Sequence, residues 1–497
     1  MSSVKKFVSD TVIYGLSTII SRMLNFVMTP IFVSKFSTAQ YGIFTNLFAY
    51  ASFINAVLAF GMETTYFRFL QRVEKENKPK VFNNTFIVTL VLASLFLLSM
   101  FVFAEQLASW FTVNKPEEYA DYVSYIKLFG IILACDAIAI VPFATLRSEG
   151  RPLYYAFLKL LNILIFVGFS LFFIYILPHL SSNMKVFSWF QEGWIGNVFV
   201  ANMIASVSTL VLLFPQIAKI KLRIDLPLVK TMLSYSFPMM IANVSFIINE
   251  NIDKMMLPRL LPVGQGDSDL GIYGAVAKIA VFLSLVITAF RLGAEPFFFS
   301  YAKKDNARAV YAKILEYFTI VTVLCMVGIT VNLDWLKYFI KSKDQIQQAL
   351  FWSGLNVVPF LLFNYVLLGI YMNLSIWYKL SDQTRFGLYI SGIGALITLV
   401  LNYFFIPMYS YVGAVAVTTV VYIVMISLSV YWGQKNYAIP YKFSKIGMYL
   451  LVGLILSLMS FFVLKSNFWT GNLLFILFIG FVVLSEKNII KQMLNRK

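Results

Sequence analysis

The chain has 497 residues, of which 60% are hydrophobic and 13% charged, and its formal net charge is +17. This composition excludes a soluble globular protein, because such proteins are about 45–50% apolar and about 25% charged. The basic residues are spread over many short segments without a compact patch. That distribution favours topology signals and contacts with anionic lipids over nucleic-acid binding.

Long hydrophobic stretches follow one another along the whole chain. Most reach the roughly 20 residues that a helix needs to cross about 30 Å of hydrocarbon. They predict an all-α polytopic membrane protein with about 14 transmembrane helices, at 8–33, 41–62, 83–104, 122–146, 153–177, 193–215, 228–252, 271–300, 311–333, 347–372, 386–406, 411–432, 446–464 and 470–485. The first stretch is too long for a signal peptide and lacks a small-residue cleavage site, so we expect a retained helix.

Lys and Arg alternate from loop to loop between these stretches. Eight segments hold 26 of the 40 Lys and Arg residues, namely the start, 68–80, 147–151, 219–230, 303–313, 379–385, 435–445 and the tail. The seven loops between them hold only nine. By the positive-inside rule the basic segments face the cytoplasm, so both termini are predicted to be cytoplasmic.

The second and eighth stretches are similar at a shift of 232 residues. At that shift Tyr41-Gly42, Gly61, Glu63 and Phe67 match Tyr273-Gly274, Gly293, Glu295 and Phe299. This repeat predicts two six-helix lobes, at 1–222 and 223–432, followed by two further helices and a cytoplasmic tail in 433–497. Because six is even, both lobes would enter the membrane from the same side.

Polar and cationic residues inside the spans predict a substrate cavity. A charge at membrane depth costs at least about 2.5–3.5 kcal/mol, so it normally faces a partner or a wet cavity. Helical spacing places Thr18, Arg22, Asn25 and Thr29 on one face of the first stretch, and Ser284, Thr288, Arg291 and Glu295 on one face of the eighth. Two more cations within spans are Lys159 and Lys278. Arg22, Arg291, Lys159 and Lys278 suit a phosphate-bearing anion.

The carboxylates in or beside the spans have more than one interpretation. They could pair with the cations as a gate, or carry a coupling H⁺ or Na⁺; the candidates are Glu63, Asp136, Glu295, Glu250 and Asp253. Asn243 adds polar lining to the seventh stretch, where Glu250 and Asp253 also fit the point at which a helix leaves the bilayer. For each charge a structural ion pair is the alternative.

No catalytic residue, metal site or further cofactor is predicted. One histidine cannot build a His-rich metal site, and the two cysteines, Cys135 and Cys325, sit in apolar stretches as expected of packing thiols.

Three segments of the sequence resemble a known transporter family. The opening VIYGLSTIISRMLNFVMTPIFVSKFSTAQYGIF is similar to the first two helices of the polysaccharide-exporter (O-antigen flippase) branch of the multidrug/oligosaccharidyl-lipid/polysaccharide (MOP) superfamily. The segment that begins SYSFPMMIANVSFIINENIDKMMLPRLL resembles its seventh and eighth helices, and TRFGLYISGIGALITLVLNYFFIPMYSYVGAVAVTTVVYIV resembles a later pair. The resemblance covers nearly the whole chain.

The resemblance implies two MATE-like six-helix lobes around a central cavity and alternating access. It implies an ion-coupled flippase for undecaprenyl-diphosphate-linked oligosaccharide, an O-antigen, capsule or exopolysaccharide repeat unit, in the bacterial inner membrane. The expected partners are this lipid-linked substrate, anionic membrane lipids and polysaccharide polymerase machinery. Arg22 and Arg291 match the cationic cavity of the family by position.

Other functions stay open at this point. A peptidoglycan-precursor flippase or a multidrug/cation antiporter would share the fold. A membrane glycosyltransferase or polymerase usually needs a sizeable extramembrane loop with catalytic carboxylates, which the sequence lacks. An ATP-driven pump is disfavoured because no GxxxxGK[ST] loop is present. We therefore expect a transporter rather than an enzyme.

Overall fold

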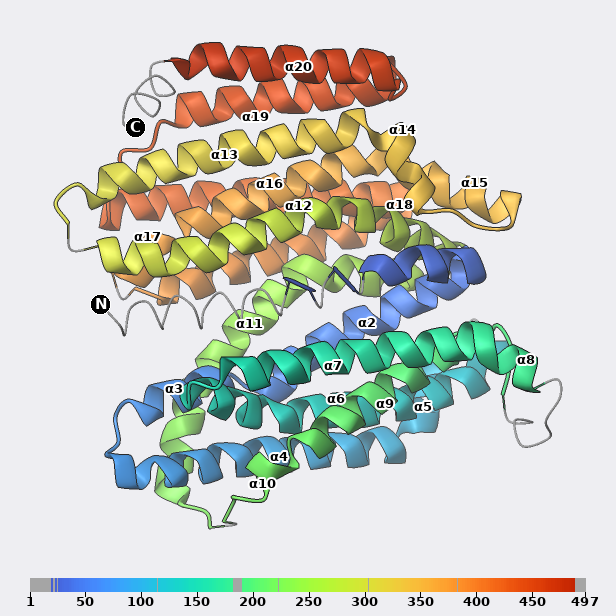
Figure 1. The fold of residues 1–497 in the computed structure, drawn as a ribbon, viewed down its shortest axis with the longest axis vertical. Coiled ribbons are helices and arrows are strands. Elements are labelled where there is room, and N and C mark those ends of the chain that lie inside the picture. The colour runs from blue at the N-terminus through green and yellow to red at the C-terminus, as the bar shows by residue number, and fades with distance from the viewer. Residues whose placement is uncertain are drawn as a thin grey trace. The chain divides into compact units, whose positions relative to one another are not determined.

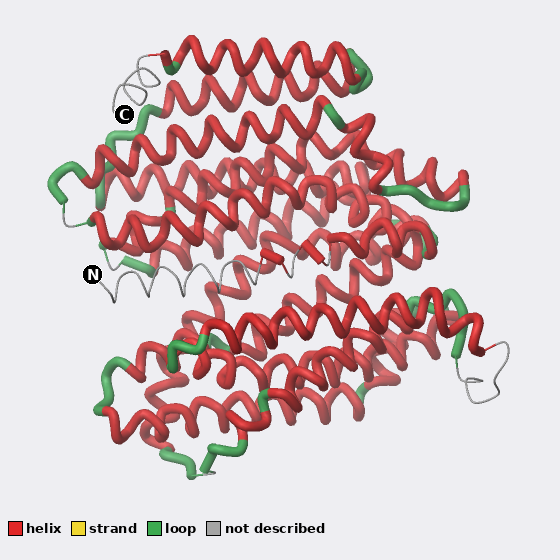
Figure 2. Tube along the Cα trace, in the orientation of Figure 1, coloured by secondary structure: helices red, strands yellow, loops and turns green. Residues whose placement is uncertain are grey.

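The computed structural model describes residues 19–20, 23–24, 26–113, 115–181, 190–221, 223–302, 304–381 and 383–487. Within these ranges every regular element is a helix and no strand is present (Figure 2). Helices are the expected solution for so apolar a chain, because each one satisfies its own backbone N–H and C=O groups without water. The all-α prediction is confirmed.

Eleven helices in the described part of the chain are long and apolar enough to cross a membrane. One of them, the 52-residue α18 (Arg385–Asn436), is divided into two helices at Ser410, where φ is 51°. Two shorter apolar helices, Phe26–Lys35 and Gly196–Leu212, lie where the first and sixth spans are predicted. The structure thus shows a multi-pass membrane protein, and the total of fourteen spans stays a prediction.

The contacts within the chain define two compact units. The first consists of Met1–Met28 and Ile43–Gly266, and the second of Thr29–Gly42 and Asp267–Lys497. The chain therefore passes from one unit to the other inside α2 (Thr38–Ala59) and near the start of α12 (Gln265–Tyr301). The lobe boundaries after residues 222 and 432 remain predictions.

The first unit is organised around one helix, α6. Beside α2, its α-helices are α3 (Met62–Leu70), α4 (Lys78–Val102), α5 (Ala104–Phe111), α6 (Tyr119–Ser148), α7 (Pro152–Leu171), α8 (Leu177–Ser181), α9 (Gly196–Leu212), α10 (Phe214–Ile217) and α11 (Leu226–Leu260) (Figure 1). Short 3₁₀ turns cover Lys75–Asn77 and Pro116–Glu118, and a π-helical turn covers Phe172–Ile176. α3, α4, α5, α7 and α9 all pack against α6.

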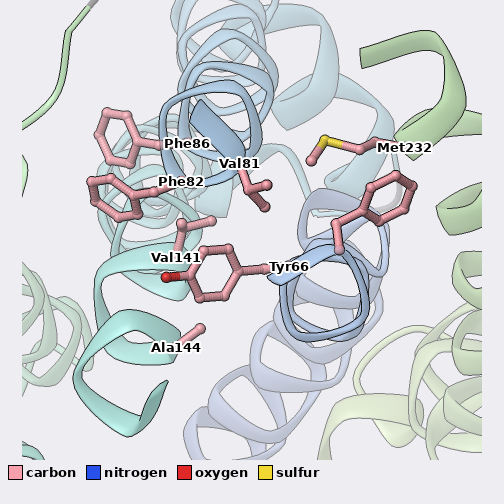
Figure 3. Packing of buried hydrophobic residues seen from close by; sticks show 8 residues of the cluster. Tyr66, Val81, Phe82, Phe86, Val141, Ala144 and Met232 are labelled. Atoms are coloured by element: carbon pink, nitrogen blue, oxygen red, sulfur yellow. The ribbon is translucent and has the colours of Figure 1, made fainter. Parts of the chain in front are cut away.

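A buried apolar cluster holds four of these helices together. Figure 3 shows its members from α3, α4, α6 and α11, including Tyr66, Val81, Phe82, Phe86, Val141, Ala144 and Met232. All of them are largely removed from solvent, and apolar burial of this kind stabilises by roughly 25 cal/mol per Å² of area. The cluster fixes the end of α3 against the start of α11.

A sharp break separates α2 from α3. Phe60 and Gly61 both adopt positive φ, of 45° and 65°. A Cβ at Gly61 would meet the Ser236 carbonyl oxygen of α11 at 3.0 Å, so glycine permits both the turn and the close approach of the two helices. Gly293, the counterpart of Gly61 in the predicted repeat, lies inside α12 with nothing near its Cβ position. The break is therefore specific to α2–α3.

The second unit contains the remaining helices. After α12 they are α13 (Ala307–Val331), α14 (Leu333–Leu336), α15 (Gln345–Ser353), α16 (Val358–Leu374), α17 (Ile376–Leu380), α18, α19 (Phe443–Leu458) and α20 (Phe468–Ser485). Short 3₁₀ turns cover Lys337–Phe339 and Gly354–Val357, and a π-helical turn covers Met459–Val463. α13 packs against α16, α19 and α20, and Figure 1 shows α19 and α20 running side by side.

Residues 29–42 pack tightly within this second unit. A Cβ at Gly42 would lie 1.8 Å from the Asp267 carbonyl oxygen, and one at Gly271 would lie 1.8 Å from the Thr38 carbonyl oxygen. The Thr38 amide also donates a hydrogen bond to Gln347 Oε1 (2.8 Å). Backbone contact at this distance leaves no room for any side chain.

Candidate functional site

A charged cavity of about 460 Å³ lies among α2, α3, α6, α7 and α9 of the first unit. Its polar lining comprises Asn55, Glu63, Asp136, Arg147, Tyr155, Lys159, Asn162, Asn202, Ser206 and Thr209. The remaining wall is formed by small and apolar residues, Ala59, Ala139, Ile140, Phe143 and Ala144. So many polar groups on membrane-spanning helices indicate a water-accessible cavity. We call it the charged cavity.

An ion pair between two helix ends occupies one part of this cavity. Glu63 lies in the first turn of α3 and Arg147 in the last turn of α6, positions at which each charge complements the helix dipole. Arg147 Nη2 lies 2.5 Å from Glu63 Oε1. The guanidinium also hydrogen-bonds to Tyr155 and lies over the ring of Phe67. Because the side chains are 33% and 46% exposed, the pair is worth only about 0–1 kcal/mol to stability.

A second pair of opposite charges is formed by Asp136 of α6 and Lys159 of α7. The Asp136 carboxylate accepts a hydrogen bond from Ser206 and interacts electrostatically with Lys159. The Lys159 ammonium lies 4.1 Å from the centroid of the Phe143 ring, a favourable cation–π position. The cavity thus holds two carboxylates and two cations, whose formal charges cancel. Removing any one of them would leave an uncompensated charge.

Amide and hydroxyl groups complete the lining between α7 and α9. Asn162 Nδ2 donates a hydrogen bond to Thr209 Oγ1 (2.9 Å), and Thr209 donates to the Ala205 carbonyl of its own helix. Among the described residues, no three His, Cys, Asp or Glu side chains come together as metal ligands.

The structure brings three of the predicted residues together here, namely Glu63, Asp136 and Lys159. Arg147 was predicted only as a loop charge, and the structure places it in α6 with its guanidinium in the cavity. Because Arg147 lies at the end of an apolar stretch, its sequence position is compatible both with a loop and with the last turn of a helix. The sequence offers no spacing that relates it to Glu63.

The predicted residues of α11 lie outside this cavity. Asn243 is exposed, Glu250 is half-buried, and Asp253 is buried. The Lys254 Nζ donates a hydrogen bond to the backbone carbonyl of Glu250 (2.8 Å) and lies 3.9 Å from the Asp253 carboxylate. This group is a separate polar cluster of the first unit.

The predicted residues of the second unit are spread along α12 and the segment before α2. Ser284 and Thr288 donate hydrogen bonds to carbonyls of their own helix, while Lys278 is half-buried and Arg291 exposed. Thr29 is buried and hydrogen-bonded to Tyr41. The Glu295 backbone is helical, and Thr18, Arg22 and Asn25 lie outside the described residues. The roles predicted for these residues stay predictions.

Comparison with solved structures identifies the class of fold. One match is the lipid II flippase MurJ in an inward closed conformation, with a TM-score of 0.68 and 13% sequence identity. The match covers 96% of this chain and 100% of the MurJ chain. Another match is an inward-facing multidrug resistance MATE family transporter, with a TM-score of 0.64 and 14% sequence identity. The match covers 86% of this chain and 95% of the transporter chain. The fold is that of the MOP superfamily of membrane transporters.

Family models narrow the class further. The model described as "Polysaccharide biosynthesis protein" matches residues 7–302, more than half of the chain, and the MatE model matches residues 238–404. The chain belongs to the polysaccharide biosynthesis protein family. No curated protein sequence matches it significantly.

Proposed function

We propose that this protein is a flippase that moves an undecaprenyl-diphosphate-linked oligosaccharide across the bacterial inner membrane. The observation that carries the proposal is the match of residues 7–302 to the polysaccharide biosynthesis family. The likeness to a lipid II flippase over nearly the whole chain supports a lipid-linked sugar as the substrate class. Alternating access by an all-helical transporter is the mechanism that this fold favours.

The charged cavity is proposed as the site that couples transport to an ion. A proton or Na⁺ that binds at Asp136 would compete with Lys159 for the carboxylate and change the summed formal charge of the lining from zero to +1. A change of one charge in the cavity alters the relative energies of two conformations in which the charged residues have different partners. The ion pair of Glu63 and Arg147 lines the same cavity and would respond to the same change.

The phosphate of the substrate is proposed to contact cations of the first and eighth spans. Arg22, Lys278 and Arg291 remain the candidates from the sequence, since guanidinium and ammonium groups are the usual partners of phosphate oxygens. Replacing Arg22 or Arg291 by Ala should abolish surface polysaccharide while the protein is still produced. Normal display of polysaccharide in both variants would exclude this part of the proposal.

Complementation tests the proposed function. A bacterial strain without its O-antigen flippase should regain surface polysaccharide when it carries this protein, provided that the protein accepts the host repeat unit. The Arg147→Gln variant, produced at the same level, is expected not to restore display, because Glu63 then lies in the cavity without its cation. Resistance to organic cations in place of polysaccharide display would favour a multidrug antiporter.

A peptidoglycan-precursor flippase is the second candidate. It is favoured by the likeness to the lipid II flippase MurJ, which extends over the whole of that chain. Rescue of a strain depleted of its peptidoglycan-precursor flippase, without rescue of O-antigen display, would select this candidate.

A further inference from the structure

A second cavity, of about 510 Å³, lies where α3 ends and α11 begins. We call it the Arg68 pocket; its lining residues are Arg68, Phe69, Arg72, Lys230, Thr231, Ser234 and Tyr235. Three of the seven side chains are cations, three carry a hydroxyl group, and none is a carboxylate. It shares no lining residue with the charged cavity.

The local sequence accounts for the way the two walls face each other. Arg68 and Arg72 are four residues apart on and just after α3, so they point to the same side. On α11 the same spacing aligns Lys230 with Ser234, and Thr231 with Tyr235. Phe69 of α3 and Met232 of α11 belong to the same buried apolar cluster, so the two helices that line the pocket are packed against one core (Figure 3). The close contact between Gly61 and the Ser236 carbonyl holds the two helices together nearby.

The cations of the pocket have no acidic partner in the described part of the chain. The Arg68 guanidinium lies 3.8 Å from the centroid of the Tyr235 ring, which orients it without neutralising it. Asp225 pairs with Lys80 and Glu63 with Arg147, whereas Glu74 and Glu76, which follow Arg72 in the chain, are exposed and do not line the pocket. Three like charges around one hollow repel each other, and an anion bound between them would relieve that repulsion.

The composition of the lining selects phosphate among anions. Two guanidinium forks can each donate two parallel hydrogen bonds to phosphate oxygens, and an ammonium and hydroxyl groups can complete the contacts. The pocket also lies at helix ends that belong to the basic segments 68–80 and 219–230, where spans are predicted to meet the cytoplasmic membrane surface. Phe69 and Tyr235 provide the aromatic lining that is usual at such an interface.

We infer that the Arg68 pocket binds the phosphate or diphosphate headgroup of a membrane lipid. Two lipids carry this chemistry: an anionic phospholipid, and the polyprenyl diphosphate of a lipid-linked saccharide. Binding of a phospholipid in this pocket does not depend on the proposed function, whereas binding of a lipid-linked saccharide rests on it. If the lipid-linked saccharide binds, the pocket would hold its diphosphate before transport.

Direct binding to the purified full-length protein tests the inference. Native mass spectrometry would count bound undecaprenyl diphosphate and, separately, bound phosphatidylglycerol. The variant Arg68→Gln/Arg72→Gln/Lys230→Gln should weaken binding of at least one of them by about tenfold or more, since one charge-assisted hydrogen bond is worth about that factor. The matched control is Lys219→Gln/Lys221→Gln/Arg223→Gln, which removes the same charge from a neighbouring basic loop that does not line the pocket. Equal melting temperatures of the two variants would show that both are folded.

The outcomes separate the two lipid sources and the two proposals. Loss of diphosphate binding alone assigns the pocket to the saccharide lipid, and loss of both assigns it to phosphate headgroups in general. Unchanged binding of both lipids, or an equal loss in the control variant, would overturn the inference. Transport that fails in wild-type protein while pocket binding persists would contradict the flippase function and leave the pocket in place.

Discussion

At the scale of single residues, the charged cavity depends on two pairs of opposite charges. Glu63 and Arg147 join the start of α3 to the end of α6, and Asp136 and Lys159 join the middle of α6 to α7. The loss of one member of either pair leaves its partner without an opposite charge, so the summed formal charge of the cavity lining is no longer zero.

Exchange of the charges at Glu63 and Arg147 tests the first pair. The single variants Glu63→Gln and Arg147→Gln should each lower transport by about tenfold or more, as expected when a partly buried charge loses its partner. The double variant Glu63→Arg/Arg147→Glu, which exchanges the two charges, should recover part of the lost transport. Arg151→Gln is the control, since Arg151 is exposed and only loosely paired with Glu149. A double variant no better than either single variant would exclude a direct functional pair.

Asp136→Asn should separate ion coupling from substrate binding. The amide cannot release a proton or carry the charge that attracts Na⁺, so transport should lose its dependence on the ion gradient while substrate still binds. The control is Asp305→Asn, at an exposed carboxylate outside the cavity. Gradient-dependent transport in the Asp136→Asn variant would exclude Asp136 as the coupling site.

The sequence predicted most of these residues but not their grouping. Each of Glu63, Asp136 and Lys159 could be predicted individually, because a charge in or beside an apolar stretch is rare and normally faces a partner or a wet cavity. Their convergence depends on how α3, α6, α7 and α9 pack, which no spacing encodes. Arg147 was missed because a basic residue at a predicted loop already has a topological explanation.

At the scale of elements, the start of α11 is fixed by its N-cap. Asp225 accepts a hydrogen bond from the Leu228 amide, its own amide donates to Asn84 Oδ1, and Lys80 Nζ lies 2.6 Å from its carboxylate. The Lys80 ammonium, followed by the Leu228 amide, holds the pKa of the Asp225 carboxyl below its usual range. These contacts position one wall of the Arg68 pocket.

Two substitutions separate the cap from the ion pair. Asp225→Asn keeps a side-chain acceptor for the cap and removes the ion pair, whereas Asp225→Ala removes both, so the alanine variant should melt at the lower temperature. Because the pKa of Asp225 is lowered in the folded protein, its carboxylate stabilises the fold at pH values above the pKa of an unfolded Asp, about 4. This stabilisation is lost as the pH falls through the lower pKa of the folded state. The difference in melting temperature between wild type and Asp225→Asn should therefore shrink as the pH falls from about 6 to below about 4. A constant difference would contradict the role of the ion pair.

The glycine contacts of the second unit are a further test at this scale. Gly42→Ala or Gly271→Ala places a methyl group 1.8 Å from a carbonyl oxygen, so residues 29–42 must move away from α12. Each variant should lower the melting temperature and impair transport. Gly392→Ala, inside α18 with nothing near its Cβ position, is the control and should be neutral or stabilising by about 0.5–1 kcal/mol. Equal behaviour of all three variants would exclude a tight contact.

Helix positions could be predicted better than helix breaks. The predicted gap between 406 and 411 contains Ser410, where α18 divides, and Pro407 and Gly413 flank that point. By contrast, the break at Phe60 and Gly61 falls inside one predicted span. The packing of Gly61 against α11 explains this break, and the sequence of an apolar stretch does not predict such a contact.

At the scale of the whole molecule, hydropathy and charge placement predicted the class of protein. The all-helical fold and the many spans are confirmed, the fold is that of MOP superfamily transporters, and the family model over residues 7–302 shows the polysaccharide biosynthesis family. The internal repeat remains a prediction, since the matched residues Gly61 and Gly293 have different conformations. Substrate identity depends on a few side chains and cannot follow from hydropathy, because transporters of lipids and of drugs share this fold.

Transport of a lipid-linked sugar by the purified protein tests the central claim most directly. Vesicles would carry a fluorescent undecaprenyl-diphosphate-linked oligosaccharide in both leaflets, and an impermeant glycosidase would report how much reaches the outside. Wild-type protein should expose the inner pool well beyond the level of protein-free vesicles, and Arg147→Gln should not. No exposure by wild-type protein, in vesicles where the same protein exchanges an organic cation for protons, would contradict the flippase function.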